Sequence, residues 1–318
     1  MQGIILAAGK GKRLHPITLQ RTKAMAPVAG KPIVERVMET LIQNGIHEFI
    51  LLISPDDADI VPYFEQKTWD IAVQFVVQPE RLGMANALSL AAPLIRGPFI
   101  LSACDNLTPV AHVAELLAMH QARGANATLS LLKIDIAQAS STGIVEWRDQ
   151  RVQRIVEKPT PEAAPSNISS LPLYVFSPRL LDYLPAVRPS ARGEYELQDA
   201  IQMLIERDGA VTGVLTPSRM QLTNTADLLA LNQHYLTVDP AAAQVLTQTI
   251  GPGTRLIPPV RIEAGCVIGA NCVIGPHVTI ERGCRIGADS KLEDSLVLRG
   301  SQLTIGESVS SKVIVTDS

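Results

Sequence analysis

From Ile250 onward a bulky aliphatic residue returns at every sixth position, and this repeat constrains the fold more than any other feature of the chain. Four residues after most of these positions stands a small or apolar side chain, and Gly, Asn or Asp fills many of the turns between. A fixed short period is typical of a solenoid, in which successive coils bury one another's apolar edge. The repeated positions are Ile250, Leu256, Ile262, Ile268, Ile274, Ile280, Ile286, Leu292 and Leu298.

These hexads resemble the left-handed parallel β-helix of hexapeptide-repeat proteins. The interval from Leu298 to Ile305 is seven residues instead of six, which predicts a loop or bulge at 299–305. Three of the four cysteines fall where the repeat favours a small inward side chain, so we interpret them as core residues in place of metal ligands. They are Cys266, Cys272 and Cys284.

The first two thirds of the chain alternate short apolar runs with longer amphipathic ones. This alternation is typical of parallel strands joined by crossover helices, and it predicts a Rossmann-like α/β domain. The region 127–176 is richer in strand-like runs, so we expect a mixed but mainly parallel sheet. The expected strands are 3–9, 48–54, 71–78 and 98–104, and the expected helices are 31–45, 84–95, 110–124, 196–207 and 225–236. The predicted domains are 1–237 and 250–318, joined by a linker at 238–249.

Charge and composition exclude several classes of protein. A net charge of −3 and a pI near 6.1 disfavour a general nucleic-acid binder, which needs excess Lys and Arg. We find no 18-residue apolar stretch and no charged leader, so we predict neither a membrane partner nor secretion. No C-x-x-C pair is present, which indicates reduced thiols and a cytoplasmic protein.

The stretch "LAAGKGKRLHP" (6–16) follows the first apolar run. A Rossmann dinucleotide fingerprint would need a glycine at Leu14, and the Walker A pattern is absent. The first 34 residues contain six cations and no acid. Glycines allow backbone N–H groups to approach phosphate oxygens, and the cations neutralise their charge, so we predict an anion site. The alternative is a solvated basic turn.

The longer stretch "LAAGKGKRLHPITLQRTKAMAPVAGKPI" resembles the signature of the sugar-1-phosphate nucleotidylyltransferases, which include glucose-1-phosphate thymidylyltransferases and UDP-sugar pyrophosphorylases. The likeness continues, in order, through "VVQPERLGMANAL", "CDN", "TGIVEW", "VEKP", "GEYELQDAI" and "NTADLLALN". The resemblance implies attack by a sugar 1-phosphate oxygen on the α-phosphorus of a nucleoside triphosphate, with Mg²⁺ as cofactor and release of pyrophosphate.

The resemblance also implies roles for residues of the signature. Arg13 would hold the departing pyrophosphate, and Lys23 would stabilise charge on the α-phosphate. The backbone of the loop would contact the nucleotide. The loop residues are Leu6, Ala7, Ala8, Gly9 and Gly11.

Asp105 directly follows an apolar strand, so its carboxylate is expected at the carboxyl edge of the sheet, where open α/β sheets bind ligands. A hard oxygen there suits Mg²⁺. The alternative is an Asx turn with Asn106.

For the base, the resemblance implies Gln78 and Gly83, in a spacing that favours uracil or thymine. For the sugar phosphate it implies Glu157 and Lys158, whose alternative is a surface salt bridge. Gly143 would leave room for the sugar ring.

Several positions depart from the family pattern. Lys12 replaces a threonine, Cys104 replaces the glycine before the metal aspartate, and Pro172 replaces a glycine near the sugar. Gln221 stands where a second metal carboxylate is usual. Asn224 could supply that metal ligand, and it could equally be the N-cap of the following helix.

Two functions from different classes remain open. The first is an active enzyme that makes a UDP- or dTDP-sugar. The second is a catalytically weakened relative that binds a nucleotide sugar as a sensor or scaffold subunit. We expect the β-helix to support a homo-oligomer, and His277 is the one candidate base for an additional acyltransferase activity.

Overall fold

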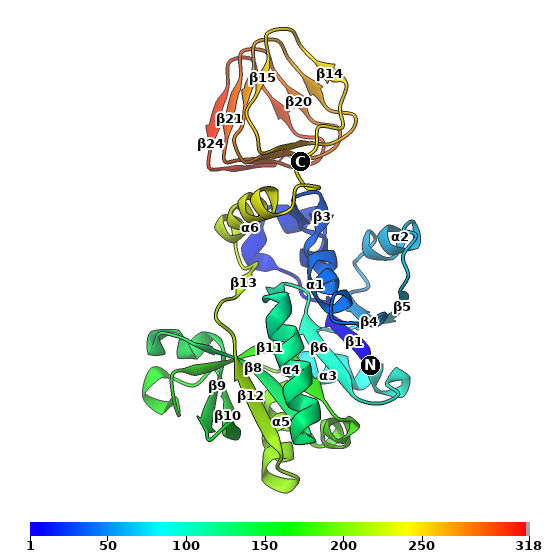
Figure 1. Cartoon of the computed structure of the whole chain (residues 1–318), viewed down its shortest axis with the longest axis vertical. Helices are drawn as coiled ribbons and strands as arrows, with labels where there is room; N and C mark the ends of the chain where they lie inside the picture. Colours follow the sequence, from blue (N-terminus) through cyan, green and yellow to red (C-terminus); the bar gives the residue numbers. More distant parts are fainter. Residues whose placement is uncertain (316–318) are drawn as a thin grey trace. The chain divides into compact units, whose positions relative to one another are not determined.

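The computed structural model describes residues 1–315, which form two compact units that interleave along the sequence (Figure 1). The sheet unit contains Met1–Lys10, Thr22–Ala24 and Val34–Met220. The solenoid unit contains Gly11–Arg21, Met25–Ile33 and the chain from Gln221 onward. Residues 316–318, the end of the predicted solenoid domain, lie outside the described residues.

The sheet unit is built on a nine-stranded mixed sheet with the order β5-β4-β1-β6-β11-β8-β12-β10-β9. Neighbours from β5 to β6 are parallel, as are β8 and β12, whereas the other neighbours are antiparallel. The prediction of a mainly parallel sheet therefore holds for its first half and for one later pair. The strands are β1 (Gln2–Leu6), β4 (Glu48–Ile53), β5 (Ala72–Val77), β6 (Phe99–Ala103), β8 (Ala127–Lys133), β9 (Gly143–Arg148), β10 (Arg151–Glu157), β11 (Ile168–Phe176) and β12 (Val211–Leu215).

All five predicted helices are present: four are shorter than predicted and the last extends to Val238, whereas the short helix Ile60–Glu65 was not predicted. The run at 84–95 stops being α-helical at Ala91 and continues as a 3₁₀ turn, Ala92–Leu94, because Pro93 cannot donate a helical hydrogen bond. Within the described residues, no helix is long and apolar enough to cross a membrane. The α-helices are α1 (Ile33–Ile42), α2 (Ile60–Glu65), α3 (Met84–Ala91), α4 (Val110–Arg123), α5 (Leu197–Arg207) and α6 (Thr225–Val238).

Pro172 lies inside β11, which is an unusual place for a residue without an N–H donor. The register between β11 and β8 shifts between Ser170 and Tyr174, so Pro172 stands at an irregularity of the ladder. Bulges of this kind release a residue from cross-strand pairing and bend the strand. The local break explains how the sheet accommodates this proline.

The repeats at the C-terminal end fold into three parallel four-stranded sheets, and each coil contributes one strand to each sheet (yellow to red in Figure 1). This arrangement fits the predicted β-helix. The first sheet has β14 (Thr249–Ile250), β17 (Val267–Ile268), β20 (Arg285–Ile286) and β23 (Gln302–Leu303). The second has β15 (Arg255–Leu256), β18 (Val273–Ile274), β21 (Lys291–Glu293) and β24 (Ser308–Ser310). The third has β16 (Val260–Ile262), β19 (Val278–Ile280), β22 (Leu296–Val297) and β25 (Val313–Ile314).

The position of the slip in the repeat corrects the sequence prediction. Ile280 pairs with Val297 and not with Leu298, so the register has already shifted between Leu292 and Val297. The predicted bulge at 299–305 is wrong, because Gln302 and Leu303 pair in β23. Val297 and Leu298 are both buried and aliphatic, and counting along the sequence therefore could not decide which one continues the ladder.

The prediction that the solenoid cysteines are core residues is confirmed. Cys266, Cys272 and Cys284 are fully buried in the apolar core of the coils, and all four cysteines of the chain are free thiols. Cys284 packs with its thiol against the carbonyl oxygen of Leu298, at 3.1 Å. A small polarisable side chain fits this interior without a cavity.

The N-terminal segments of the solenoid unit are attached to α6. The side chain of Asn232 accepts a hydrogen bond from Ala29 N (2.8 Å) and donates to Pro27 O (3.0 Å). Pro27 and Val28 form β2 (Pro27–Val28), which pairs with β3 (Lys31–Pro32). After α6, residues 244–246 of the predicted linker bond to Ile262 of the first coils through backbone hydrogen bonds of 2.7 and 2.8 Å.

Candidate active site

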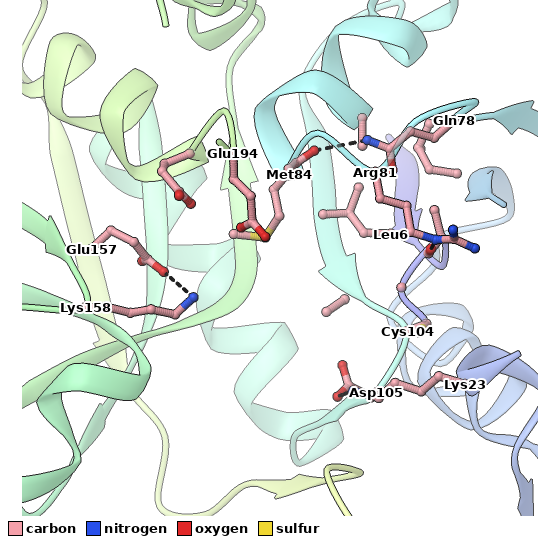
Figure 2. Close-up of a pocket in the computed structure, with 17 residues that line it drawn as sticks. Leu6, Lys23, Gln78, Arg81, Met84, Cys104, Asp105, Glu157, Lys158 and Glu194 are labelled. Atoms are coloured by element: carbon pink, nitrogen blue, oxygen red, sulfur yellow. Dashed lines mark hydrogen bonds and ion pairs between the residues drawn. The ribbon is translucent and has the colours of Figure 1, made fainter. Parts of the chain in front are cut away.

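A cavity of about 340 Å³ opens in the sheet unit at the carboxyl ends of β1 and β6 (Figure 2). Leu6 O accepts a hydrogen bond from Cys104 N (3.1 Å), so the first loop and the loop after β6 leave the sheet side by side. This is the edge at which open α/β sheets bind ligands. The lining residues are Leu6, Ala8, Gly9, Lys23, Leu52, Gln78, Arg81, Gly83, Met84, Ala87, Ala103, Cys104, Asp105, Glu157, Lys158, Glu194 and Glu196.

The loop that follows β1 is held on the sheet by contacts that the sequence did not predict. Arg81 donates from Nε to Ala8 O (2.8 Å) and from Nη2 to Asp56 Oδ2 (2.9 Å). The Arg81 guanidinium lowers the pKa of the Asp56 carboxyl by hydrogen bonding and by its charge. Arg81 thus fixes the carbonyl of Ala8 and adds a cation to the cavity. Its position within "PERLG" did not indicate this role. Ala7 itself is fully buried beside β4 and does not line the cavity.

Lys23 and Asp105 meet at the floor of the cavity, where Lys23 Nζ forms an ion pair with Asp105 Oδ2 (Figure 2). Both side chains are mostly buried, with 18% and 15% of their surface exposed. The neighbouring Cys104 is buried, and burial together with the Asp105 charge raises the pKa of its thiol to about 12. Cys104 therefore stays a neutral thiol beside the carboxylate, and replacing the usual glycine adds no charge to the site.

Gln78 is buried at the opposite end of the cavity from Glu157 (Figure 2). Its Nε2 donates to Gly83 O (3.2 Å) and to Asn86 Oδ1 (2.9 Å), so its amide is oriented before any ligand arrives.

Gly83 lines the cavity, and the fold itself requires a glycine there. With φ of +102°, a Cβ at Gly83 would lie 2.6 Å from Tyr195 O. Its missing side chain thus accommodates the backbone of Tyr195, and helix α3 starts there with Ala85 N bonded to the same Tyr195 carbonyl (3.1 Å).

Glu157 and Lys158 lie at the end of β10 and form an ion pair of 3.3 Å. The Glu157 side chain is only 11% exposed, so the pair is not a solvated surface bridge. Burial raises the pKa of Glu157, and the charge of Lys158 partly offsets that effect. Lys158 has a φ of +45°, a conformation that costs a non-glycine residue energy and that clusters at functional sites.

Gly143 also corrects an expectation. It is buried opposite Glu157 in the β9–β10 ladder, and a Cβ there would lie 3.1 Å from Glu157 Oε2. The glycine makes room for the Glu157 carboxylate, and it does not itself line the cavity.

Two further carboxylates reach the cavity from the segment before α5, Glu194 and Glu196. Glu196 Oε1 accepts from Arg192 Nη2 (2.7 Å) and Ser190 Oγ (2.8 Å), and Arg192 Nη2 is also 3.6 Å from Glu157 Oε1. The sequence signal for these carboxylates was the charge-rich run "ARGEYE". The family resemblance includes part of this run but implied no role for any of its residues.

Three predicted site residues belong to the solenoid unit and are described there. Gly11 adopts a left-handed conformation (φ +62°) before the 3₁₀ turn Lys12–Leu14, and Arg13 in that turn is exposed. Asn224 caps α6 in a capping box, in which its Oδ1 accepts from Asp227 N (3.0 Å) and Asp227 Oδ2 accepts from Asn224 N (3.1 Å). The cap prediction is confirmed, and a ligand role for Asn224 stays a prediction.

Comparison with known proteins decides the family. Residues 2–236 match the family described as "Nucleotidyl transferase", and residues 256–318 match "GMPPB C-terminal domain". The chain belongs to the nucleotidyl transferase family. The predicted family is thereby confirmed.

Relatives within this nucleotidyl transferase family carry several names. The chain is 30% identical over 279 residues to "Bifunctional protein GlmU" of Methanococcus maripaludis, an alignment that covers 87% of this chain and 62% of that protein. It is 28% identical to "Glucose-1-phosphate thymidylyltransferase" of Streptomyces griseus, with 96% and 89% covered. The chain spans between about half and two thirds of the length of the GlmU proteins that it matches.

Solved structures share the fold of this nucleotidyl transferase. A UDP-glucose pyrophosphorylase complexed with UDP-glucose superposes with a TM-score of 0.68 at 19% identity, covering 74% of this chain and 98% of that one. The mixed Rossmann-like α/β core is therefore shared at low sequence identity.

Proposed function

We propose that this protein transfers a nucleotidyl group from UTP or dTTP to a sugar 1-phosphate, in a reaction that depends on Mg²⁺. A phosphate oxygen of the sugar 1-phosphate forms a bond to the α-phosphorus, and the bond from the α-phosphorus to the bridging oxygen breaks. The products are a nucleotide sugar and pyrophosphate. The names of the relatives, which include thymidylyltransferases and a UTP–glucose-1-phosphate uridylyltransferase, support this class of substrate.

The observation that carries the proposal is one cavity in which three predicted groups converge. It joins the loop residues Leu6 and Gly9, the Lys23–Asp105 pair and the Glu157–Lys158 pair (Figure 2). A reaction between two phosphorylated substrates needs such neighbouring subsites, because positioning and charge neutralisation supply most of its catalysis.

At the nucleotide end, the loop offers backbone groups and open space. A Cβ at Gly9 would meet no atom within 4 Å, so a ligand can approach this part of the backbone closely. Gln78 is proposed to bind a base edge with its amide, whose Nε2 is oriented by Gly83 and Asn86. Both Nε2 hydrogens are donated within the protein, which leaves Oε1 as an acceptor that matches the N3–H of uracil or thymine.

Lys23 is proposed to stabilise the charge that grows on the α-phosphate. It already points toward the carboxylate at the cavity floor, so it is preorganised and needs little movement during the reaction. Arg13 is proposed to bind the departing pyrophosphate through its exposed guanidinium.

The residues present fit a magnesium ion, which would be held beside the triphosphate. Asp105 has one carboxylate oxygen paired with Lys23, and its other oxygen, Oδ1, has no partner among residues 1–315. The described part of the chain contains no cluster of three or more His, Cys, Asp or Glu side chains arranged for a metal. Mg²⁺ is commonly bound by one or two carboxylates together with substrate phosphates and water. Asp105 would hold the ion, which when bound neutralises phosphate charge. A ligand role for Asn224, which belongs to the solenoid unit, stays a prediction.

At the sugar end, Lys158 would bind the phosphate of the sugar 1-phosphate and Glu157 would accept hydrogen bonds from hydroxyl groups. Glu157 is buried and held by Lys158 and Arg192, so its carboxylate is fixed before binding. The nearby Glu194 and Glu196 provide further acceptors. This end of the cavity is rich in carboxylates, which favours a neutral polyhydroxy ring over an acidic one.

A coupled assay of pyrophosphate release tests the proposal. Purified protein is mixed with Mg²⁺, one of several nucleoside triphosphates and one of several sugar 1-phosphates. Release with UTP or dTTP that requires a sugar phosphate supports the proposal. The second candidate, a sensor or scaffold, is motivated by the neutral, exposed Gln221. Tight binding of a nucleotide sugar with no turnover for any pair would favour that candidate.

The proposal includes a cytoplasmic setting and a homo-oligomer, with a solenoid of left-handed sense. Four free cysteines support a reducing compartment. His277 is engaged with Asp294, with 3.0 Å between Nδ1 and Oδ1, which favours a structural role for this histidine over acyl transfer.

A further inference from the structure

The N-terminal signature is divided between the two units of the molecule. Residues up to Lys10 and the segment Thr22–Ala24, which carries Lys23, belong to the sheet unit. The segment Gly11–Arg21, which carries Arg13, belongs to the solenoid unit. The chain thus passes from the solenoid unit to the sheet unit between Arg13 and Lys23, the two cations that the proposed reaction needs.

A buried ion pair attaches this segment to the solenoid. Arg21 donates from Nη1 to Glu281 Oε1 (2.8 Å) and from Nη2 to Glu281 Oε2 (2.9 Å). The side chains are only 4% and 10% exposed. Arg299 reinforces the attachment, because its backbone N donates to Glu281 Oε2 (2.9 Å) and its Nη2 donates to Gln20 O (2.8 Å).

The repeat alone does not explain this pair. Glu263 stands one coil before Glu281, and its Oε2 likewise accepts from a backbone N of the next coil, Arg282 N (3.0 Å). That backbone bond is therefore a feature of the solenoid turn. Only Glu281 of these two glutamates also binds the segment Gly11–Arg21, and Glu263 instead binds Arg261 within the solenoid, at 3.3 Å.

The geometry of the Arg21–Glu281 pair constrains the position of its segment more strongly than an exposed surface ion pair would. Two parallel N–H···O bonds between a guanidinium and a carboxylate fix orientation as well as distance. Arg21 is two residues before Lys23 and eight residues after Arg13. A displacement of about 1 Å in a reacting group can cost roughly a hundredfold in rate.

We propose that Glu281 is a positioning residue for the transfer reaction: from the solenoid it holds Arg21, and through Arg21 it fixes the segment that carries Arg13. The inference rests on the proposed function. It gives the solenoid an indirect part in binding the triphosphate, through Arg21 and Arg13, whereas the proposed sugar-phosphate residues Glu157 and Lys158 belong to the sheet unit.

Steady-state kinetics of Glu281→Gln test the proposal, because the substitution keeps the shape of the side chain but removes its charge. We expect the KM for the triphosphate to rise about tenfold and kcat to fall roughly 10- to 100-fold. The KM for the sugar phosphate should stay within about twofold, since its subsite is elsewhere. Hydrogen exchange at residues 11–21 should become faster. Glu263→Gln is the matched control and should leave both constants and the exchange unchanged.

A second variant covers the case in which Glu281→Gln folds poorly because the Arg21 charge is left buried alone. The double variant Arg21→Met with Glu281→Met removes both charges, and apolar replacement of a whole buried pair is commonly tolerated. The same selective rise in the KM for the triphosphate is expected. Unchanged constants in this folded variant, or equal rises for both substrates, would overturn the proposal. Absence of turnover in the unmodified protein would instead overturn the proposed function.

Discussion

The two units treat buried polar groups differently. In the sheet unit, polar atoms without a partner among the described residues include Asn106 next to Asp105, Glu157 Oε2, Gln198 Oε1 and Arg219 Nε. In the solenoid unit such atoms are fewer, Arg21 Nε and Thr279 Oγ1, and the carboxylates of Glu281 and Glu263 are each bound by a side chain and a backbone N–H. Buried polar groups without partners reduce stability, and they concentrate where a ligand can later satisfy them.

The difference indicates that the two units have different roles, one structural and one in binding. Each coil of the solenoid repeats the same arrangement, in which aliphatic ladders fill the core and the turns are hydrogen-bonded. Few buried polar groups among its described residues lack a partner, so the solenoid is suited to hold other segments in place. The sheet unit carries cations and carboxylates around a cavity, an arrangement that favours binding of charged substrates over stability of the free protein.

The largest expected effect lies in the cavity. Lys23→Met and Asp105→Asn should each lower kcat by roughly 10²–10³-fold, because each removes preorganised charge from the reacting phosphate. The thermal midpoint should fall modestly, because each variant leaves one mostly buried charge without its partner. Lys291→Met, on an exposed solenoid strand, is the matched control and should keep full turnover. A loss of activity in Lys291→Met as large as that in Lys23→Met would contradict the assignment.

Core truncation distinguishes the stability of the units. Ile280→Ala in the solenoid and Leu101→Ala in the sheet remove fully buried side chains, and each should cost about 2–5 kcal/mol of unfolding free energy. Hydrogen exchange should show faster opening in the coils for the first variant and in β1, β6 and β11 for the second. Identical exchange changes in both units for both variants would show that they do not differ as described.

Two glycines with positive φ give a smaller and more specific contrast. An alanine at Gly83 would clash with Tyr195 O as well as adopt an unfavourable φ, whereas an alanine at Gly283 (φ +73°) would meet no atom within 4 Å. Gly283→Ala should therefore cost about 1 kcal/mol, and Gly83→Ala more, together with weaker triphosphate binding. Urea unfolding and the KM for UTP measure the two effects. Equal losses of stability would show that the Tyr195 backbone moves aside at no cost.

The smallest expected effect is a pH dependence confined to the sheet unit. Burial lowers the pKa of both His112 and His120 below the ordinary 6.5, so the unfolded chain binds protons more readily than the folded one. Their contribution to stability should thus be complete above pH 6.5 and decline as the pH falls below it. Thermal unfolding of the sheet unit between pH 7.5 and 5.5 checks this. Replacing both by Gln should flatten the profile; an unchanged slope would refute the histidine origin.

The sequence predicted where strands and helices lie better than how they pair. Hydrophobic periodicity located most strands and helices of both units, although not α2 or β12, because alternating burial leaves a direct trace in the residue order. It could not distinguish Val297 from Leu298 at the slip in the solenoid, since both are aliphatic and both are buried. The antiparallel pairings of β11 depend on long-range contacts that no local pattern records.

The site shows the same limit. Lys23, Asp105, Glu157 and Lys158 were found through contiguous motifs, and the structure brings them to one cavity. The neighbours of two glycines could not be predicted: Gly83 meets the backbone of Tyr195, from a distant segment, and Gly143 meets Glu157 on the adjacent strand. Arg21 was counted only as part of a basic cluster, and nothing in the sequence indicated its partner 260 residues away.

The most direct test of the account is a phosphorus NMR spectrum of the complete reaction, recorded with UTP or dTTP, a hexose 1-phosphate and Mg²⁺. The account predicts that resonances of a nucleotide sugar and of pyrophosphate grow in equal amounts, and that Lys23→Met suppresses both together. Growth of nucleoside monophosphate or inorganic phosphate without a nucleotide sugar, or equal product formation by Lys23→Met, would contradict it.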